Sequence, residues 1–282
     1  MLGPSLKRQR RIKPILLQIA AIVTFVAMIF PIYALFLTSL QPESVIRSRD
    51  VSFFPSTLYF AHFAEVLSPG HIVPIVAAIG NSMIVSILTA TARVLLALPA
   101  AYALARLPVP GGRFILGGLV SIYFLPTILF MIPLFIAFVN RGLNDTFLGL
   151  VLLYTGFILP FQIWILRGFI DRVPGELDEA AKLDGATYLQ LFVRIIIPLV
   201  RPGILAGYLF AFILSWIEFL TPLIFTNNLK VSTVSLGLYR STIDIQVGQL
   251  AAAAVLTLLP VALLTLIFQR LVTRVFLAGA DK

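Results

Sequence analysis

Long apolar runs separated by short polar segments make up most of the chain. A hydrocarbon core about 30 Å thick is crossed by about 20 apolar residues in a helical conformation. Six runs reach this length, and they cover approximately residues 15–38, 74–104, 114–139, 146–169, 203–225 and 250–272. The pattern therefore predicts an all-α integral membrane protein with six transmembrane helices.

A charged interruption, residues 173–203, separates the fourth run from the fifth. Pro174 suits the first turn of a helix, where its missing N–H costs nothing, and the acidic residues that follow favour the positive end of a helix dipole. Gly185 can take the left-handed conformation that ends a helix. We therefore expect a short helix over approximately residues 175–183.

A second helix is predicted directly after Gly185. Thr187 and Gln190 have the spacing of a capping box. Apolar residues then recur at three- and four-residue intervals, and we expect this helix to end at Pro198, because proline interrupts helical hydrogen bonds. The two helices form an elbow that is too polar to cross a membrane.

The sequence of this elbow resembles a known motif. The string EAAKLDGA at residues 179–186, with Pro198 after it, is similar to the EAA loop in permease subunits of bacterial ABC importers. The resemblance implies that the first short helix is a coupling helix, which docks into a cleft on a separate ATPase subunit. By the same resemblance, the residues that couple to the ATPase are Glu179, Ala180, Ala181, Asp184, Gly185, Ala186 and Pro198. An ordinary amphipathic connector between two spans is the alternative interpretation.

The resemblance covers approximately residues 30–278, and the segments AAYALAR and LPFQIWILRGF direct it to the maltose-transporter type of carbohydrate permease. It implies a single permease domain over residues 15–273, between a basic N-terminus at 1–14 and a tail at 274–282. The partners that it implies are a second permease subunit in a heterodimer, two ATPase subunits and an extracytoplasmic solute-binding protein. The location that it implies is the bacterial plasma (inner) membrane.

The distribution of basic residues predicts the orientation. The formal net charge is +9. With the N-terminus in the cytoplasm, fifteen Lys and Arg residues fall inside, Arg93 lies within a span, and five fall outside, namely Arg47, Arg49, Arg141, Lys230 and Arg240. Cytoplasmic segments are enriched in Lys and Arg, so both termini are expected in the cytoplasm. Membrane orientation thus accounts for the basic charge without a nucleic-acid partner.

Composition removes several other classes of function. Hydrophobic residues make up 60% of the chain and charged residues only 12%, which excludes an ordinary soluble domain. There is no cysteine, so disulfides and thiol chemistry are excluded. The two histidines, His62 and His71, fall in one outer segment and are interpreted as satisfied surface residues, with no metal site and no catalytic residue. We interpret the first apolar run as an uncleaved transmembrane helix rather than a signal peptide.

Two charged residues fall inside the predicted spans. At 1.5 Å per residue, Arg93 and Glu218 lie about 20 and 24 Å from the inner surface. A charge at such a depth is costly unless it is paired or faces a cavity. They are therefore candidates for the translocation path, for a mutual ion pair, or for capping by other polar groups, and the weaker path candidates are Trp216, Tyr123 and Asn81.

The sequence contains no Walker P-loop, because no glycine is followed by lysine and then serine or threonine. The expected function is therefore that of a permease that binds no cofactor itself, with ATP and Mg²⁺ bound by partner ATPase subunits. The solute expected from the resemblance is a sugar or a sugar-like molecule. The alternatives are an ABC permease for amino acids, peptides or polyamines, an independent secondary transporter or channel, and a membrane-embedded enzyme, against which the lack of a His-Glu-x-x-His motif argues.

Overall fold

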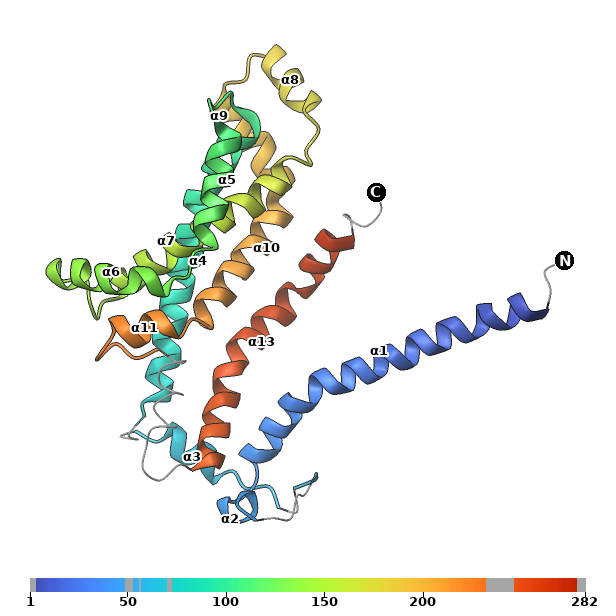
Figure 1. Ribbon diagram of the computed structural model, residues 1–282, viewed down its shortest axis with the longest axis vertical. Helices are drawn as coiled ribbons and strands as arrows, with labels where there is room; N and C mark the ends of the chain where they lie inside the picture. The colour runs from blue at the N-terminus through green and yellow to red at the C-terminus, as the bar shows by residue number, and fades with distance from the viewer. Residues whose placement is uncertain (1–3, 49–52, 56, 70–72, 232–245, 278–282) are drawn as a thin grey trace. The chain divides into compact units, whose positions relative to one another are not determined.

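The computed structural model describes residues 4–48, 53–55, 57–69, 73–231 and 246–277 (Figure 1). Arg49, His71, Arg240 and the end of the predicted tail at 278–282 lie outside these residues. Within the described part every regular element is helical, as the sequence predicts. In chain order the helices are α1 (Pro4–Ser39), α2 (Glu43–Ile46), α3 (Ala61–Leu67), α4 (Ile75–Arg106), α5 (Gly112–Tyr123), α6 (Ile128–Asn140), α7 (Phe147–Ile170), α8 (Glu176–Leu183), α9 (Tyr188–Leu191), the π-helical turn η1 (Phe192–Ile196), α10 (Ile197–Trp216), α11 (Leu220–Phe225) and α13 (Val247–Leu277).

Five helical stretches are long and apolar enough to cross a membrane. They are Ile15–Ser39, Ile75–Arg106, Phe147–Ile170, Tyr188–Trp216 and Val247–Phe268. A sixth crossing is obtained if α5 and α6 count as one span, but these two helices meet at a bend of 90°. The third apolar run is thus not the single helix expected from the sequence, because Pro126 falls in the break, where its ring and missing N–H oppose helix continuation.

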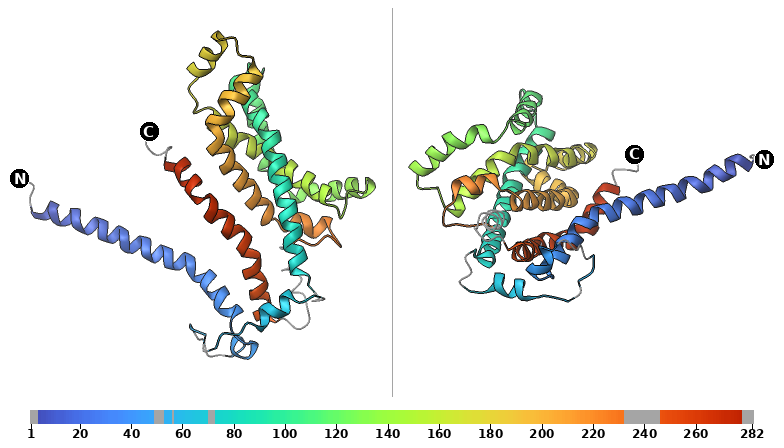
Figure 2. Two further views of the ribbon diagram at one scale, coloured as in Figure 1. Left: turned by 180° about the vertical axis from the view of Figure 1, so that it is seen from behind. Right: turned by 60° about the horizontal axis from the view of Figure 1, so that its bottom comes forward.

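The described chain forms two compact units, Met1–Val73 with Leu238–Leu256, and Pro74–Gly237 with Thr257–Lys282. In the first unit, α2 and α3 lie beside the beginning of α13. In the second unit, α4 packs along α7 and α10 (Figure 2). Small residues on α4 allow this approach, and Ala90, Ala97 and Ala101 have no exposed surface.

Two glycines of α10 permit its contact with α7. A Cβ atom at Gly203 would lie 2.4 Å from the Phe169 ring, and one at Gly207 would lie 2.7 Å from Nε2 of Gln162. Both distances are below van der Waals contact, so a Cβ at Gly203 would displace the Phe169 ring and one at Gly207 would displace the Gln162 amide. The two glycines have small-xxx-small spacing, which permits close approach between membrane helices.

The second helix of the elbow does not end at Pro198, and that expectation is wrong. Residues 188–216 form one continuous stretch, in which α9 passes through η1 into α10. Pro198 is the second residue of α10 and follows directly on the π-helical turn. The wider turn relieves the clash between the proline ring and the preceding carbonyl groups, and it accommodates the missing N–H.

Candidate functional site

The elbow between α7 and α10 is built by local sequence signals. Gly185 follows α8 with φ +79°, and its N–H donates to the Lys182 carbonyl at 3.0 Å. Thr187 Oγ1 accepts from the Gln190 N–H at 3.3 Å, while Gln190 Oε1 accepts from the Thr187 N–H at 2.8 Å. The left-handed glycine and the capping box are thus confirmed, and they fix the turn between the two helices.

The inner face of α8 carries Asp178 and Ala181, one turn apart. Both are buried, and Ala181 belongs to a core cluster with Ala97, Ala101 and Leu191. The EAA resemblance implies that both Ala180 and Ala181 couple to the ATPase, but Ala181 packs against this chain's own helices. The i, i+3 spacing of 178 and 181 places them together on the side that faces the core.

The outer face of α8 is exposed. Leu183 is 89% exposed, and Leu177 is also exposed. Of the other residues implied by the EAA resemblance, Ala186 is half-buried, whereas Glu179, Ala180, Asp184, Gly185 and Pro198 are exposed. The outer face therefore combines apolar, small and acidic side chains that no described residue of this chain covers.

A buried ion pair ties α8 to the end of α4. Arg106 Nε lies 3.1 Å from Asp178 Oδ2, and both side chains are largely buried. Arg106 Nη2 also donates to the carbonyl oxygens of Ile170, at 3.1 Å, and Val173. The sequence analysis missed this pair because its members are far apart in the chain. Each residue also has an ordinary local explanation, since Arg106 is a basic residue in the last turn of a helix and Asp178 is an acidic residue in the first turn of another.

Arg93 lies inside the packed helices and has no exposed surface. Its Nε donates to the Tyr154 carbonyl at 3.1 Å, Nη1 donates to the Ala211 carbonyl at 3.1 Å, and Nη2 also donates to Tyr154. The guanidinium thus joins α4 to the backbones of α7 and α10. It does not line an open path in this structure, and the interpretation that other polar groups satisfy it fits best.

Glu218 lies in the break between α10 and α11 and is half-buried. Its Oε1 accepts hydrogen bonds from the N–H and the Oγ1 of Thr221, both at 3.0 Å. The carboxylate therefore supports the beginning of α11, and its negative charge attracts Arg93 electrostatically. Glu218 is therefore more accessible than Arg93.

Two of the weaker path candidates are held inside the chain. Trp216 is buried and stacks on Phe212, with ring centroids 5.7 Å apart and planes inclined by 21°. Asn81 Nδ2 donates to the Lys230 carbonyl at 2.8 Å. These contacts hold both side chains against other parts of this chain.

Tyr123 belongs to a row of aromatic side chains from three helices. Tyr123 stacks on Phe161 at 4.8 Å with an interplanar angle of 13°. Phe161 in turn contacts Trp164 at 5.7 Å and Phe210 at 5.8 Å. Trp164 is 50% exposed and Phe210 is also exposed, so this aromatic row has an accessible surface. Tyr123 also borders an apolar cleft of about 620 Å³ between α5, α6 and α7.

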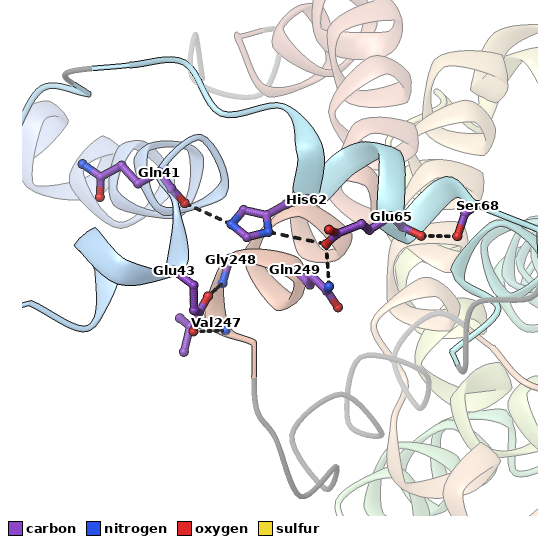
Figure 3. A network of polar contacts seen from close by, with 8 residues as sticks. All are labelled: Gln41, Glu43, His62, Glu65, Ser68, Val247, Gly248 and Gln249. Atoms are coloured by element: carbon purple, nitrogen blue, oxygen red, sulfur yellow. Dashed lines mark hydrogen bonds and ion pairs between the residues drawn. The ribbon is translucent and has the colours of Figure 1, made fainter.

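A network of polar contacts holds α2 and α3 against the beginning of α13 (Figure 3). The Glu43 carboxylate accepts hydrogen bonds from the backbone N–H groups of Val247 and Gly248, each at 3.0 Å. Partial burial raises the pKa of Glu43, but the hydrogen bonds from Gly248, Arg47 and Val247 outweigh this effect and lower it overall. The carboxylate therefore stays ionised and caps α13.

His62 belongs to the same network and is buried, not on the surface as expected. Its Nε2 is 3.0 Å from the Gln41 carbonyl oxygen, and its Nδ1 is 3.9 Å from Glu65 Oε2. Gln249 Nε2 donates to the same Glu65 oxygen at 2.6 Å. Among the described residues no group of three acidic, histidine or cysteine side chains is placed to hold a metal ion.

Comparisons with known proteins identify the family. The family model of the binding-protein-dependent transport system inner membrane component matches residues 93–276. The diacetylchitobiose uptake system permease protein DasC of Streptomyces coelicolor is 31% identical over 94% of this chain and 95% of its own length. The trehalose transport system permease protein SugB of Mycobacterium tuberculosis is 34% identical, over 90% and 92% respectively. The trehalose/maltose transport system permease protein MalG of Thermococcus litoralis is 30% identical, over 98% and 99%.

A solved structure has the same fold. It belongs to a bacterial ABC transporter involved in the import of the acidic polysaccharide alginate, and it superposes with a TM-score of 0.74 over 96% of this chain and 98% of that chain, at 20% identity. This helical fold, the apolar helices and the family match agree with one another. The chain is a multi-pass membrane protein that belongs to the family of inner-membrane components of binding-protein-dependent transport systems.

Proposed function

We propose that this chain is one of two permease subunits of an ATP-driven importer for sugars or sugar-like solutes. The three relatives described above are named as permeases for diacetylchitobiose, trehalose, and trehalose or maltose, and this chain spans at least 90% of each. A permease for amino acids, peptides or polyamines is the alternative within ABC importers. The shared carbohydrate character of the relatives favours a sugar.

The observation that most supports this proposal is the elbow formed by α8 and α9. Its inner face is buried against α4, while its outer face presents Leu183 with Glu179 and Ala180 nearby. The exposed Leu183 provides an apolar anchor, and the small side chain of Ala180 permits close approach by a partner. The elbow thus acts as the coupling helix, and a separate cytoplasmic ATPase subunit covers this outer face.

The energy source is external to the chain. With no P-loop in the sequence, ATP and Mg²⁺ are bound by two partner ATPase subunits. The excess of Lys and Arg on the side of the elbow supports a cytoplasmic location for the elbow and for both termini. An extracytoplasmic solute-binding protein delivers the solute to the opposite side.

The aromatic row is the best candidate for solute contact. Sugar rings have apolar C–H faces, and aromatic side chains provide flat surfaces on which such faces pack, with few polar groups needed for orientation. Phe161, Trp164 and Phe210 offer such surfaces on α7 and α10, next to Tyr123 on α5. Glu218 is our candidate for a hydrogen-bonding carboxylate on the path, whereas Arg93 supports the helices.

The experiment is affinity purification of the tagged chain from its native membranes, followed by reconstitution into liposomes. We expect an ATPase and a second permease to co-purify. Uptake of labelled di- and oligosaccharides should require both internal ATP and the binding protein. Omission of the binding protein and replacement of ATP by a non-hydrolysable analogue are the controls. Uptake driven by an ion gradient without ATP would instead establish a secondary transporter and refute the proposal.

A further inference from the structure

The end of α4 contacts both helical parts of the elbow, which are α8 and the α9–η1 stretch. Tyr102 and Arg106 lie one turn apart on α4, and therefore on the same face. The Tyr102 ring lies 4.8 Å from the Phe192 ring, and its hydroxyl is 3.5 Å from the Tyr188 carbonyl oxygen. Tyr102 therefore contacts the α9–η1 stretch. Arg106 pairs with Asp178 in α8. One helix end thus engages α8 on one side and the α9–η1 stretch on the other.

Arg106 joins three elements through a single side chain. Its guanidinium contacts the Asp178 carboxylate of α8 and the carbonyl groups of Ile170 and Val173. The Ile170 carbonyl at the end of α7 also accepts from the Val173 N–H at 3.0 Å, so Arg106 binds the turn that follows α7 as a second donor. Arg106 therefore fixes α4, the end of α7 and α8 with respect to one another.

Asp178 depends on this contact. Within the described part of the chain its Oδ1 has no hydrogen-bond partner, and Oδ2 lies 3.1 Å from Arg106 Nε. Both side chains are largely buried, with 15% and 10% of their surface exposed. Exposed ion pairs are weak because water screens them, whereas removal of one member of a buried pair leaves an uncompensated charge. The pair is therefore a stiff attachment rather than a surface contact.

We propose that Arg106 and Asp178 are positioning residues that transmit displacement of α8 to α4 during transport. This inference rests on the proposed function, in which a partner ATPase moves the outer face of α8. The pair lies on the inner face of α8, opposite the outer face that the proposed function assigns to the ATPase. Its loss leaves ATP hydrolysis in place but separates it from movement of the transmembrane helices.

The first test compares solute imported per ATP hydrolysed in reconstituted complexes. We expect Asp178→Asn and Arg106→Gln to retain the co-purified ATPase and its hydrolysis, yet to import about fivefold less solute per ATP. Arg106→Lys keeps the charge opposite Asp178 and should recover part of the ratio. The matched control is Asp171→Asn, because Asp171 is 47% exposed and pairs with Arg167 four residues away on the surface. This control should leave the ratio unchanged.

The second test measures the attachment directly and does not require transport. The chain has no cysteine, so spin labels can be placed at introduced cysteines, Leu96→Cys on α4 and Glu176→Cys on α8, both at exposed positions. In membrane nanodiscs we expect one narrow distance distribution for the otherwise unchanged chain and for Asp171→Asn. Asp178→Asn should broaden or shift the distribution.

The outcomes separate the two proposals. If the unchanged complex shows no ATP-driven uptake, the proposed function fails, while the label distances still report whether the ion pair holds α8. An unchanged import ratio in both Asp178→Asn and Arg106→Gln would overturn the coupling role. If these variants do not assemble, the same distance distribution with and without Asp178→Asn would equally refute it, because the pair would then not position α8.

Discussion

Arg93 is a full positive charge in the interior of apolar helices, and its hydrogen bonds explain how it is held there. Its donors reach the carbonyl groups of Tyr154 and Ala211, and the negative charge of Glu218 attracts it. Ser86 and Thr89 are fully buried on the same face of α4, so this face is polar where it enters the core. Charged groups within membrane spans are tolerated when they are satisfied in this way.

We therefore predict that Arg93→Lys destabilises the chain without changing its transport per folded complex. Lysine has no planar fork of donors and cannot reproduce the bonds to two different helices. The loss of one charge-assisted hydrogen bond should lower the free energy of unfolding by about 2 kcal/mol. Thermal unfolding in detergent measures this, with the exposed Arg141→Lys as the control. Lower uptake at unchanged stability would instead place Arg93 on the solute path.

Asp145 makes the turn before α7 sensitive to pH. It has φ +58°, and its carboxylate accepts from the backbone N–H groups of Asn227, Asn228 and Leu229 at 2.8 to 3.0 Å. Partial burial raises the pKa of Asp145, but the hydrogen bonds, with Leu229 first, lower it overall. A lowered pKa in the folded state means that the stabilisation is present above the unfolded value, about 3.9, and is lost as pH falls through the folded value.

Asp145→Asn should remove this dependence on pH. Asparagine has nearly the same shape and tolerates a positive φ, so it retains the turn but not the charge. We expect the variant to have a lower thermal midpoint than the unchanged chain at neutral pH, and the difference to shrink below about pH 4. A difference that stays constant between pH 3 and 7 would show that the charge contributes nothing to this turn.

At the scale of elements, the geometry of the elbow depends on Gly185. No atom lies within 4 Å of the position that a Cβ would occupy there, so a side chain meets open space and the only obstacle is φ +79°. A β-branched residue in this conformation costs on the order of 1 to 2 kcal/mol. The chain can relieve that strain by changing the angle between α8 and α9.

Gly185→Val should therefore insert normally but couple poorly. We expect weaker recovery of the ATPase and a roughly tenfold loss of ATP-driven uptake, as a strain of this size allows. Gly185→Asn should retain most of the activity, since asparagine visits the left-handed region. Gly175→Val is a matched control, because Gly175 has φ −66° and the same open surroundings. Normal uptake by Gly185→Val would make the elbow a passive connector.

The elements that the sequence predicts correctly are those with local causes. The glycine turn and the Thr187–Gln190 capping box each depend on residues within a few positions of one another. Helix ends at prolines are harder to predict. The helix continues through Pro198, directly after a π-helical turn, whereas Pro126 lies in a break where two helices meet at a bend of 90°. Which of these occurs depends on packing from distant helices.

Contacts between side chains that are distant in sequence are also difficult to predict from the sequence. The EAA resemblance assigns Ala181 to the contact with the ATPase. Ala181 packs into the core instead, because Asp178 and Arg106 orient that side of α8 toward α4. The aromatic row also combines residues from α5, α7 and α10, which are far apart in the chain. Spacing within one helix shows which residues share a face but not what that face contacts.

At the scale of the whole molecule, the proposed orientation can be tested on either side of one helix. α7 has 24 residues, so at 1.5 Å per residue it is about 36 Å long, enough to cross the hydrocarbon core. Arg141 lies exposed before this helix, and Leu183 lies exposed on the elbow after it. If α7 crosses the membrane once, these two positions lie on opposite sides.

Single cysteines at these positions should therefore react differently with a membrane-impermeant thiol reagent. In intact cells we expect Arg141→Cys to be labelled and Leu183→Cys to react only after the membrane is permeabilised, because the excess of basic residues assigns the elbow to the cytoplasm. The unchanged chain contains no cysteine and provides the blank. Labelling of Leu183→Cys alone would reverse the orientation and separate the elbow from any cytoplasmic ATPase. Labelling of both in intact cells would mean that α7 does not cross the membrane, and the number of spans would then have to be revised.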